Sequence, residues 1–170
     1  AEINDVLNLT QTIKELEKAD TNKIGMFGWS RGGMMTYLAL QKTDKIKTAI
    51  IGNGVSNLFE EINFRPEMET RVFAECIPNY WANKKNELEK RSVIFWANEL
   101  NQKSSLLILC GTKDDRVNPK QSDDIGKKLK EIGYDFELQK FETNHYFTEK
   151  RTELNELVIK WFNEKLKNIH

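Results

Sequence analysis

The sequence IGMFGWSRGG at residues 24–33 joins a short apolar run to a helical one. The apolar run ends at Trp29, Ser30 follows, and the helical pattern MMTYLAL continues at residues 34–40. A strand, a sharp turn with a serine at its apex and a helix, with glycines where a side chain would clash, are typical of a nucleophile elbow. A serine hydroxyl needs a base to take its proton. We therefore expect the rest of the chain to supply a histidine and a carboxylate.

Candidates for both partners follow two later strand-like runs. SLLILCG at residues 105–111 is continuously apolar, as in a strand covered on both faces, and Asp114 and Asp115 come soon after it. FELQKF at residues 136–141 alternates, and His145 follows it. Because reactive groups gather at the carboxyl ends of parallel strands, these side chains can converge on the serine. The predicted roles are a nucleophile, a base and an aspartate that orients the imidazole.

Each partner has a plainer alternative. The aspartate pair can also be a solvated turn, and the pattern alone leaves open which of the two would face a histidine. His145 can also be a surface residue of its loop. The other histidine, His170, lies at the end of the chain without a strand to place it. If Ser30 has a base from this chain, we expect that base to be His145.

Helical and strand-like patterns alternate along the chain. Strands are predicted at residues 23–29, 48–52, 105–111 and 136–141. Helices are predicted at residues 5–18, at about 31–42, between Asn118 and Gly133, and near the C-terminal end through Leu154 and Trp161. This alternation predicts the α/β class, with a parallel sheet flanked by helices.

A single domain over residues 1–170 is expected. Within it, residues 57–103 lose the regular alternation and are predicted to form a helical insertion over the sheet edge. Trp81 and Trp96 in this stretch are expected to fill the core rather than to roof the site. The first helix carries its apolar side chains at helical spacing, at Val6, Leu9, Ile13 and Leu16.

The composition argues against several functions. The chain has 26 basic and 26 acidic residues, so no net charge draws it to nucleic acid or to a membrane surface. No apolar run approaches the roughly 20 residues of a membrane helix, and no signal peptide is recognised. Cys110 lies in an apolar run far from Cys76 and is predicted to be a buried free thiol, which favours a cytoplasmic setting. No metal-ligand cluster or phosphate-binding loop is present, so no metal or cofactor is expected.

Three motifs carry a resemblance to a known family. They are GWSRGG at residues 28–33, GTKDDRVNP at residues 111–119 and NHYF at residues 144–147. Together they resemble the catalytic domain of the prolyl oligopeptidase family of serine peptidases (peptidase S9), which has the α/β-hydrolase fold. The similarity extends from the first predicted helix to the last.

The resemblance implies roles for particular residues. The catalytic triad would consist of Ser30, Asp114 and His145, with Asp115 as the alternative if the loop register differs by one. The backbone N–H of Arg31 is expected to be one oxyanion donor, because it begins the helix after the serine, where unpaired N–H groups and the helix dipole favour an anion.

Residues that contact substrate are implied as well. Arg116 would hydrogen-bond a carbonyl of the bound peptide, with a salt bridge to Asp115 or a nearby glutamate as the alternative. Val55 and Leu58 align with the family region that lines the primary side-chain pocket, and Trp29 is also expected to contact substrate. A small or medium apolar residue next to the scissile bond is the resulting hypothesis, and plain core packing of these residues is its alternative.

Compared with this family, the sequence starts in the middle of the fold. Strands precede the elbow strand in the family and an early loop gives the second oxyanion donor, whereas residues 1–19 offer only a helix. The family's β-propeller is missing too. The elbow strand is therefore expected at a sheet edge, where unpaired N–H and C=O groups invite pairing. We expect a fragment, or a sheet completed by another copy or another chain.

Three functions follow from these observations. The leading interpretation is a serine hydrolase that cleaves the peptide bonds of short peptides through an acyl-enzyme on Ser30. The first alternative is an esterase or acyl-peptide hydrolase, because the same triad cleaves esters and amides. The second is a non-catalytic fragment or interaction module with an incomplete oxyanion hole. The expected partner is thus a short peptide or an acyl ester.

Overall fold

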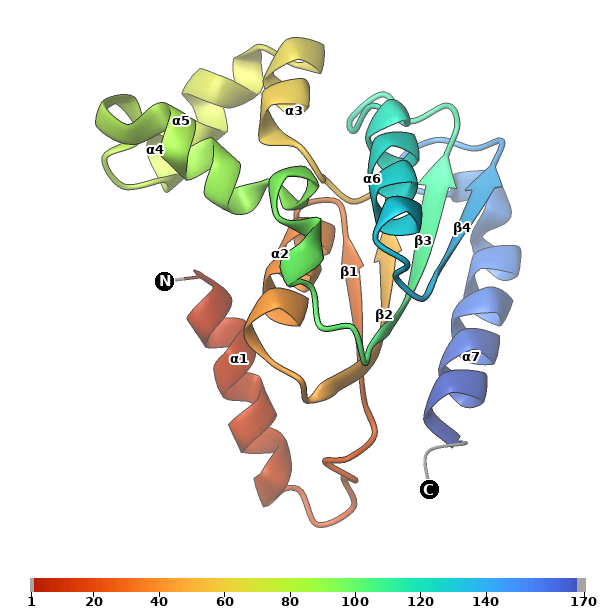
Figure 1. Ribbon diagram of the computed structural model, residues 1–170. Helices are drawn as coiled ribbons and strands as arrows, with labels where there is room; N and C mark the ends of the chain where they lie inside the picture. Colours follow the sequence, from red (N-terminus) through yellow and green to blue (C-terminus); the bar gives the residue numbers. More distant parts are fainter. Residues whose placement is uncertain (1, 168–170) are drawn as a thin grey trace.

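The computed structural model describes residues 2–167, and its centre is a parallel β-sheet (Figure 1). The strands are β1 (Ile24–Trp29), β2 (Ile46–Gly52), β3 (Ser105–Gly111) and β4 (Phe136–Phe141). They lie in the order β1-β2-β3-β4, and every neighbouring pair is parallel. All the carboxyl ends therefore meet at one edge of the sheet.

Helices connect and cover the strands. They are α1 (Glu2–Thr12), α2 (Arg31–Lys42), α3 (Leu58–Phe64), α4 (Ala74–Cys76), α5 (Tyr80–Arg91), α6 (Lys120–Glu131) and α7 (Arg151–Lys167). Single turns of 3₁₀ helix lie at Ile13–Glu15, Val93–Phe95, Ala97–Glu99 and Thr148–Lys150, and a π-helical turn at Glu69–Phe73 precedes α4. No helix within residues 2–167 combines the length and the apolar composition that crossing a membrane requires.

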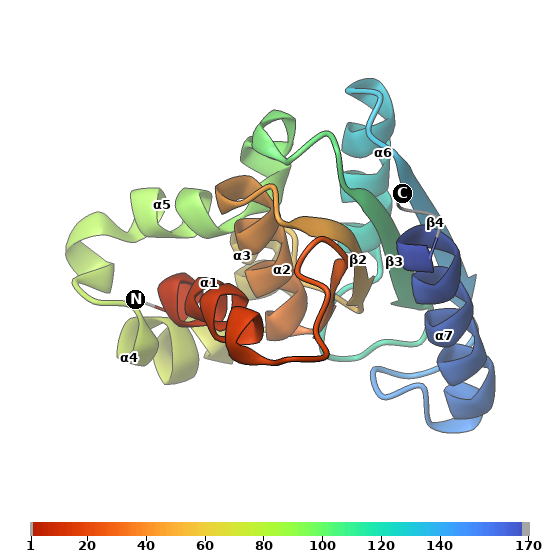
Figure 2. The ribbon, with the colours of Figure 1, turned by 90° about the horizontal axis from the view of Figure 1, so that it is seen from below.

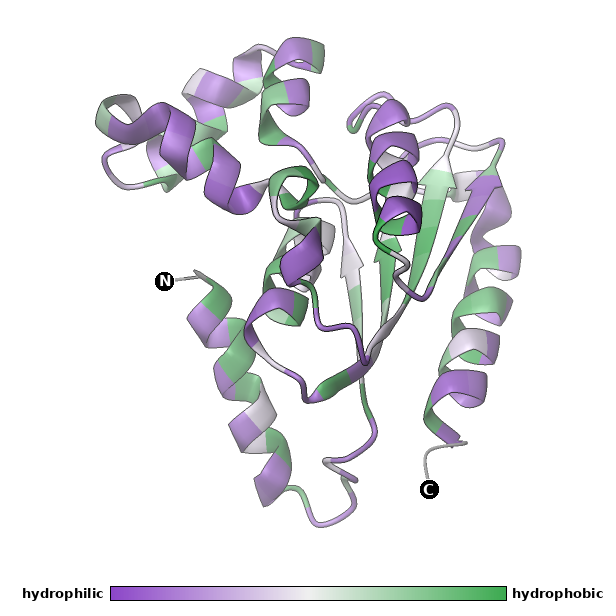
Figure 3. Ribbon diagram, viewed as in Figure 1, coloured by the Kyte–Doolittle hydropathy of each residue, from purple (hydrophilic) through white to green (hydrophobic). Residues whose placement is uncertain are grey.

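The two faces of the sheet are covered by different helices. Helices α2 and α6 lie on one face and α7 on the other (Figure 2). Because side chains alternate along a strand, Ile51 and Ile108 pack with α2 and α6, whereas Ile50 and Leu107 pack toward α7. The middle strands β2 and β3 are covered on both sides, and β3 is green along most of its length in Figure 3.

Helix α7 is anchored to the sheet by a buried tryptophan. Trp161 is 3% exposed, and its indole N–H donates a hydrogen bond to Thr48 Oγ1 at 2.7 Å. Helix α6 is stopped as predicted, since Gly133 has a φ of +68°. At the other end of α6, Asn118 Oδ1 accepts a hydrogen bond from the backbone N–H of Lys120 at 3.1 Å, as a capping side chain does.

The first helix differs from its prediction. Helix α1 starts at Glu2 and its α-helical hydrogen bonding ends at Thr12, and it packs against α2 through Ile3, Val6 and Leu7. The helix predicted over residues 5–18 is therefore shorter than expected, and Leu9 and Leu16, two of the four apolar residues that indicated it, are 60% and 58% exposed. Only one face of a helix can pack against a single neighbouring helix. In α1 that face carries Ile3, Val6 and Leu7, and Leu9 lies outside it.

The strand before the serine lies at the edge of the sheet. Within residues 2–167, β1 pairs with β2 alone, and no strand precedes it. Phe27 of β1 is 46% exposed. The α/β class, the parallel sheet and the edge position of the elbow strand are therefore as predicted.

The irregular stretch after β2 lies above the carboxyl ends of the strands. Helices α3, α4 and α5 lie there in Figure 1, and the 3₁₀ turns Val93–Phe95 and Ala97–Glu99 lead back to β3. Polar contacts hold the helices of this layer together: the backbone N–H of Leu58 in α3 donates to Ser92 Oγ, at the end of α5, at 2.9 Å. These helices thus stand where they can form a wall of any site at the strand ends.

Candidate active site

The turn between β1 and α2 consists of one residue. The backbone of Ser30 has φ 54° and ψ −119°, a conformation that residues other than glycine rarely adopt and that is typical of functional sites. Its backbone N–H donates to Gly52 O at 2.9 Å, and its carbonyl accepts from Gly33 N at 2.9 Å. The serine is therefore held by the ends of β1, β2 and α2 at once.

Two glycines permit this close approach. A Cβ at Gly28 would collide with the carbonyl of Gly32 and with Thr36 Oγ1, and a Cβ at Gly33 would lie 2.7 Å from Gly54 Cα. A Cβ at Gly32 would meet no atom within 4 Å. The expected clash is thus present on the strand side of the serine and at Gly33, but not at Gly32.

Asp114 and His145 form a buried pair. His145 Nδ1 lies 2.7 Å from Asp114 Oδ2, and the two residues are 4% and 6% exposed. The second oxygen of the aspartate accepts hydrogen bonds from the backbone N–H groups of Arg116 (2.8 Å) and Val117 (2.9 Å). Asp115 points to solvent. Of the two aspartates that the sequence left open, the structure brings Asp114 to the histidine.

The loop of His145 is fastened through its backbone. The carbonyl oxygen of His145 accepts a hydrogen bond from Asn53 Nδ2 at 2.9 Å and another from Trp29 Nε1 at 3.1 Å. Asn53 is 2% exposed and has a φ of 43°. This residue was not predicted from the sequence, although Asn followed by Gly directly after a strand is a turn signal.

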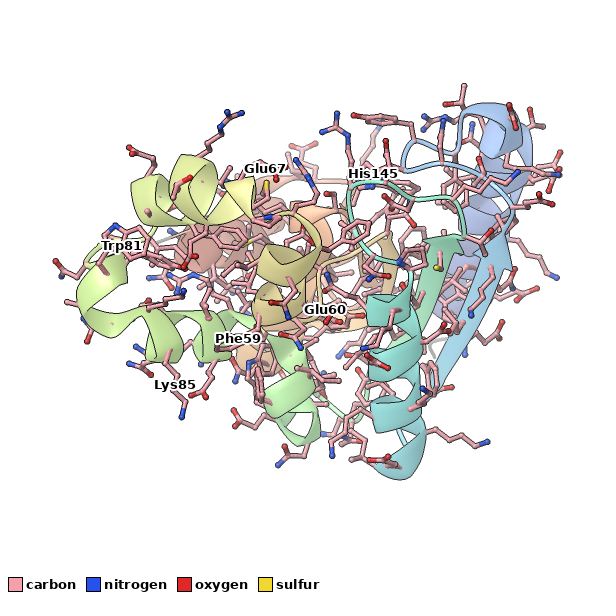
Figure 4. The ribbon with its side chains drawn as sticks, turned by 90° about the horizontal axis from the view of Figure 1, so that it is seen from above. Phe59, Glu60, Glu67, Trp81, Lys85 and His145 are labelled. Atoms are coloured by element: carbon pink, nitrogen blue, oxygen red, sulfur yellow. The ribbon has the colours of Figure 1, made fainter. Side chains whose placement is uncertain are left out.

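A cavity of about 240 Å³ opens beside the serine. Ser30 and His145 line it, and so do Val55, Leu58 and Arg116. Figure 4 looks down on the strand ends and labels His145 on its loop and Phe59 and Glu60 on α3. The structure therefore gathers the predicted nucleophile, base and pocket residues around one space.

Two tryptophans lie elsewhere. Trp29 does not line this cavity, and its ring packs edge-on against Phe147, with the centroids 5.2 Å apart. Its position suits it to hold the histidine loop rather than to touch substrate. Trp81 is 63% exposed and lies far from His145 in Figure 4, so it neither fills the core nor covers the site, whereas Trp96 is 7% exposed and is a core residue.

The residues predicted to bind the oxyanion and a substrate carbonyl, Arg31 and Arg116, both line the cavity. Arg31 lines the cavity and begins the 12-residue helix α2, so its backbone N–H belongs to the positive end of the helix dipole. The guanidinium of Arg116 lies 5.4 Å from the centroid of the Tyr146 ring. Within residues 2–167 it forms no ion pair with Asp115 or with a glutamate.

No hydrogen bond joins Ser30 Oγ to the His145 ring among the described residues. Such contacts are often long in the absence of substrate and tighten in the complex. The same described part of the chain holds no cluster of three metal-ligating side chains.

One further polar residue of the cavity was missed by the sequence analysis. Glu61 lines the cavity, is 2% exposed and accepts a hydrogen bond from Gln121 Nε2 at 3.1 Å. Burial raises its pKa to about 7. Its spacing from Leu58 is a signal that could have found it, because residues three apart on a helix share a face.

A strained serine between a strand and a helix, with a buried Asp–His pair on the loops after later parallel strands, defines an α/β-hydrolase site. The chain belongs to the prolyl oligopeptidase family, whose family model matches residues 1–168. The resemblance inferred from the three motifs is confirmed by this match.

Individual relatives are much longer than this chain. The uncharacterized peptidase YuxL of Bacillus subtilis is 28% identical over 141 residues, which are 81% of this chain and 21% of YuxL. The Pyrococcus horikoshii acylaminoacyl peptidase superposes with a TM-score of 0.85 at 26% identity, over 99% of this chain and 28% of that one. A puromycin-hydrolyzing peptidase of Mycobacterium tuberculosis has the same fold, with a TM-score of 0.82 at 23% identity over 96% and 25%.

Proposed function

We propose that this chain carries the reacting groups of a serine peptidase that acts by acyl transfer. Ser30 Oγ attacks the carbonyl carbon of the scissile amide while His145 Nε2 takes its proton. The oxyanion of the tetrahedral intermediate accepts a hydrogen bond from the N–H of Arg31. The C–N bond then breaks, and His145 gives the proton to the leaving amine. A water molecule, deprotonated by His145, next attacks the acyl carbon. The bond from that carbon to Ser30 Oγ then breaks, His145 gives the proton to Ser30 Oγ, and the acid is released.

The contact between Asp114 and His145 is the observation that carries this proposal. Asp114 accepts only, so it favours the tautomer with the proton on Nδ1. Nε2 is then left as the basic nitrogen, and the carboxylate stabilises the imidazolium once it forms. The two N–H groups that bind the other aspartate oxygen keep that carboxylate in place.

The cavity beside Ser30 supports a peptide substrate. Val55 and Leu58 line it, and its volume of about 240 Å³ suits one side chain next to the scissile bond. In the proposal, Arg116 at the mouth binds a carbonyl of the peptide. The helices of the proposed insertion at residues 57–103 supply much of the wall, and an acylaminoacyl peptidase among the relatives makes acylated short peptides the first substrates to try.

A fluorophosphonate probe tests the proposal on the intact protein. The probe should label Ser30, as mapped by mass spectrometry, and should not label Ser30→Ala. Labelling of His145→Ala should be slower by at least about 10³-fold, since the base is lost. Circular dichroism of each variant verifies that it is folded. Labelling of the wild type at another residue, or none in folded protein, contradicts the proposal.

The same protein and variants also distinguish the proposed function from two alternative functions. Turnover of a nitrophenyl ester without turnover of any peptide would favour the esterase or acyl-peptide hydrolase. A folded protein that is not labelled and that forms a stable dimer would favour an interaction module. The exposed edge of β1 supports this last reading, because its free N–H and C=O groups can pair with a second strand.

A further inference from the structure

Glu61 is the most deeply placed charged side chain of the cavity beside Ser30. It lies on α3 and is only 2% exposed, although it lines the cavity. The surfaces around it are apolar, with Leu58, Phe73 and Ile77 among the buried residues that line the same space. A carboxylate in such surroundings is costly unless it has a partner.

The protein supplies only part of that partner. Gln121 Nε2 donates to Glu61 Oε2 at 3.1 Å. The oxygen and nitrogen of this amide cannot exchange places, because Gln121 Oε1 accepts hydrogen bonds from the backbone N–H groups of Ser56 (3.0 Å) and Asn57 (2.9 Å). Within residues 2–167, no hydrogen bond reaches Glu61 Oε1. Every fully buried side-chain oxygen in this part of the chain has a hydrogen-bond partner, so Oε1 is not fully buried. Oε1 is therefore reachable from the cavity.

No nearby arginine forms an ion pair with Glu61 among the described residues, although the charge of Arg65 lowers the pKa of its carboxyl group. Arg65 and Arg91 also line the cavity, but Arg65 Nε pairs with Glu67 Oε1 at 3.0 Å and Arg91 Nη1 with Glu87 Oε2 at 2.6 Å. Arg116 lies over the Tyr146 ring, as described above. Among the described residues, no salt bridge reaches Glu61. A buried carboxylate with a free oxygen thus faces a cavity of side-chain size.

We propose that Glu61 determines specificity: its carboxylate binds the cationic end of a lysine or arginine side chain that occupies the cavity next to the scissile bond. This assignment rests on the proposed function, and it replaces the hypothesis of a small or medium apolar side chain. The apolar walls contact the methylene stem of the substrate residue, and Glu61 Oε1 accepts hydrogen bonds from its charged group.

The charge state of Glu61 makes this preference depend on pH. Burial raises its pKa to about 7, the negative charge of Asp114 also raises it, and Arg65, Gln121 and His145 act against this. Above that pH the carboxylate is ionised and attracts a cation, and below it the neutral carboxyl group loses most of this attraction. A neutral substrate side chain gains nothing from the ionisation.

Two substrates that differ only in the terminal group test the proposal. Acylated peptide amides with lysine or with norleucine before the scissile bond have the same stem, so the ratio of their kcat/KM values isolates the ammonium group. We expect lysine to be favoured by about 10-fold or more at about pH 8, with the ratio falling toward unity below about pH 6. Any pH effect on the reaction at Ser30 itself is common to both substrates and cancels in the ratio.

The matched variants are Glu61→Gln and Glu60→Gln. Glutamine at 61 keeps the shape and can still accept from Gln121, but it removes the charge, so the lysine preference and its pH dependence should vanish. Glu60 is the neighbouring carboxylate on α3, does not line the cavity and instead accepts from Asn118 Nδ2, so its variant should keep both. An unchanged ratio in Glu61→Gln, or a preference for glutamate over norleucine in the wild type, overturns the proposal.

Failure of the proposed function is distinguished by the fluorophosphonate, which carries no such side chain. Normal labelling with a lysine-to-norleucine ratio near unity overturns only the role of Glu61. If Ser30 is not labelled, the proposed function fails. Calorimetry then tests separately whether Glu61 binds a cationic side chain. N-acetyl-lysine amide should then bind the wild type more tightly than N-acetyl-norleucine amide and bind Glu61→Gln equally, and equal binding to the wild type overturns the assignment.

Discussion

The side-chain amide of Asn53 donates a hydrogen bond to the carbonyl oxygen of His145 at 2.9 Å, and this fastens the histidine loop to the end of β2. The amide oxygen of Asn53 accepts from the backbone N–H of Gly111, at the end of β3, at 2.7 Å. One buried side chain thus sets the spacing between two strand ends and the loop that carries the imidazole.

Asn53→Ala should lower both stability and reactivity. It removes two buried hydrogen bonds and places alanine at a φ of 43°, so we expect a loss of about 2–4 kcal/mol in the free energy of unfolding. Urea denaturation and the rate of fluorophosphonate labelling measure the two effects. Asn53→Gly is the control, since glycine accepts the backbone angle and only the hydrogen bonds are lost. A labelling rate unchanged in both variants would contradict the positioning role.

Asp114→Asn and Asp115→Asn should differ sharply although they are neighbours. Asparagine at 114 can present an N–H to the imidazole and favour the wrong tautomer, so we expect labelling to slow by about 10³- to 10⁴-fold. The exposed Asp115 makes no contact with His145 and its variant should label at nearly the wild-type rate. Equal loss in both variants would show that net charge, and not the contact with His145, is what matters.

Gly28→Ala and Gly32→Ala compare a crowded glycine with an open one. The new Cβ at 28 would collide with the backbone of Gly32 and with Thr36, so we expect about 3 kcal/mol or more of lost stability. The new Cβ at 32 meets nothing and lies in a helix, where alanine is favoured, so stability should stay within about 1 kcal/mol of the wild type. Thermal and urea denaturation of both variants check this order.

Glu61→Gln should change how stability depends on pH. The pKa of Glu61 is raised from 4.5 to about 7 in the folded protein, so between these values the folded chain binds more protons than the unfolded chain. Stability of the wild type therefore falls as pH rises through this window, by up to about 3 kcal/mol from this residue. The variant lacks this loss, so its advantage should grow from about pH 5 to pH 7 and then level off. Urea denaturation across this range, with Glu60→Gln as the control, measures it.

The elements that local patterns define were predictable from the sequence. The run SLLILCG could be read as a buried strand because every residue of β3 is covered, and the turn at Ser30 is marked by its glycines. Gly133 and Asn118 marked the two ends of α6 for the same local reasons. The candidates for nucleophile, base and aspartate followed from their places after predicted strands.

The features that depend on packing were not predictable. The residue pattern alone did not separate Asp114 from Asp115, and only the family resemblance favoured Asp114, because it is the fold of their loop that buries Asp114 and exposes Asp115. The amide of Asn53 bonds to His145, 92 residues away, which no local pattern reports. Glu61 was passed over because charged residues are mostly exposed, and its burial depends on the contact of α3 with Gln121.

The reacting groups and the side-chain cavity belong to separate parts of the chain. Ser30, Asp114 and His145 are held by the ends of the strands, whereas Leu58 and Glu61 belong to a helix between β2 and β3. If the proposed function holds, substitutions on this helix can change the substrate preference while the proposed acid–base groups keep their positions. Under the proposed function, a few substitutions in a single helix are then enough to give related proteins different peptide substrates with the same reaction.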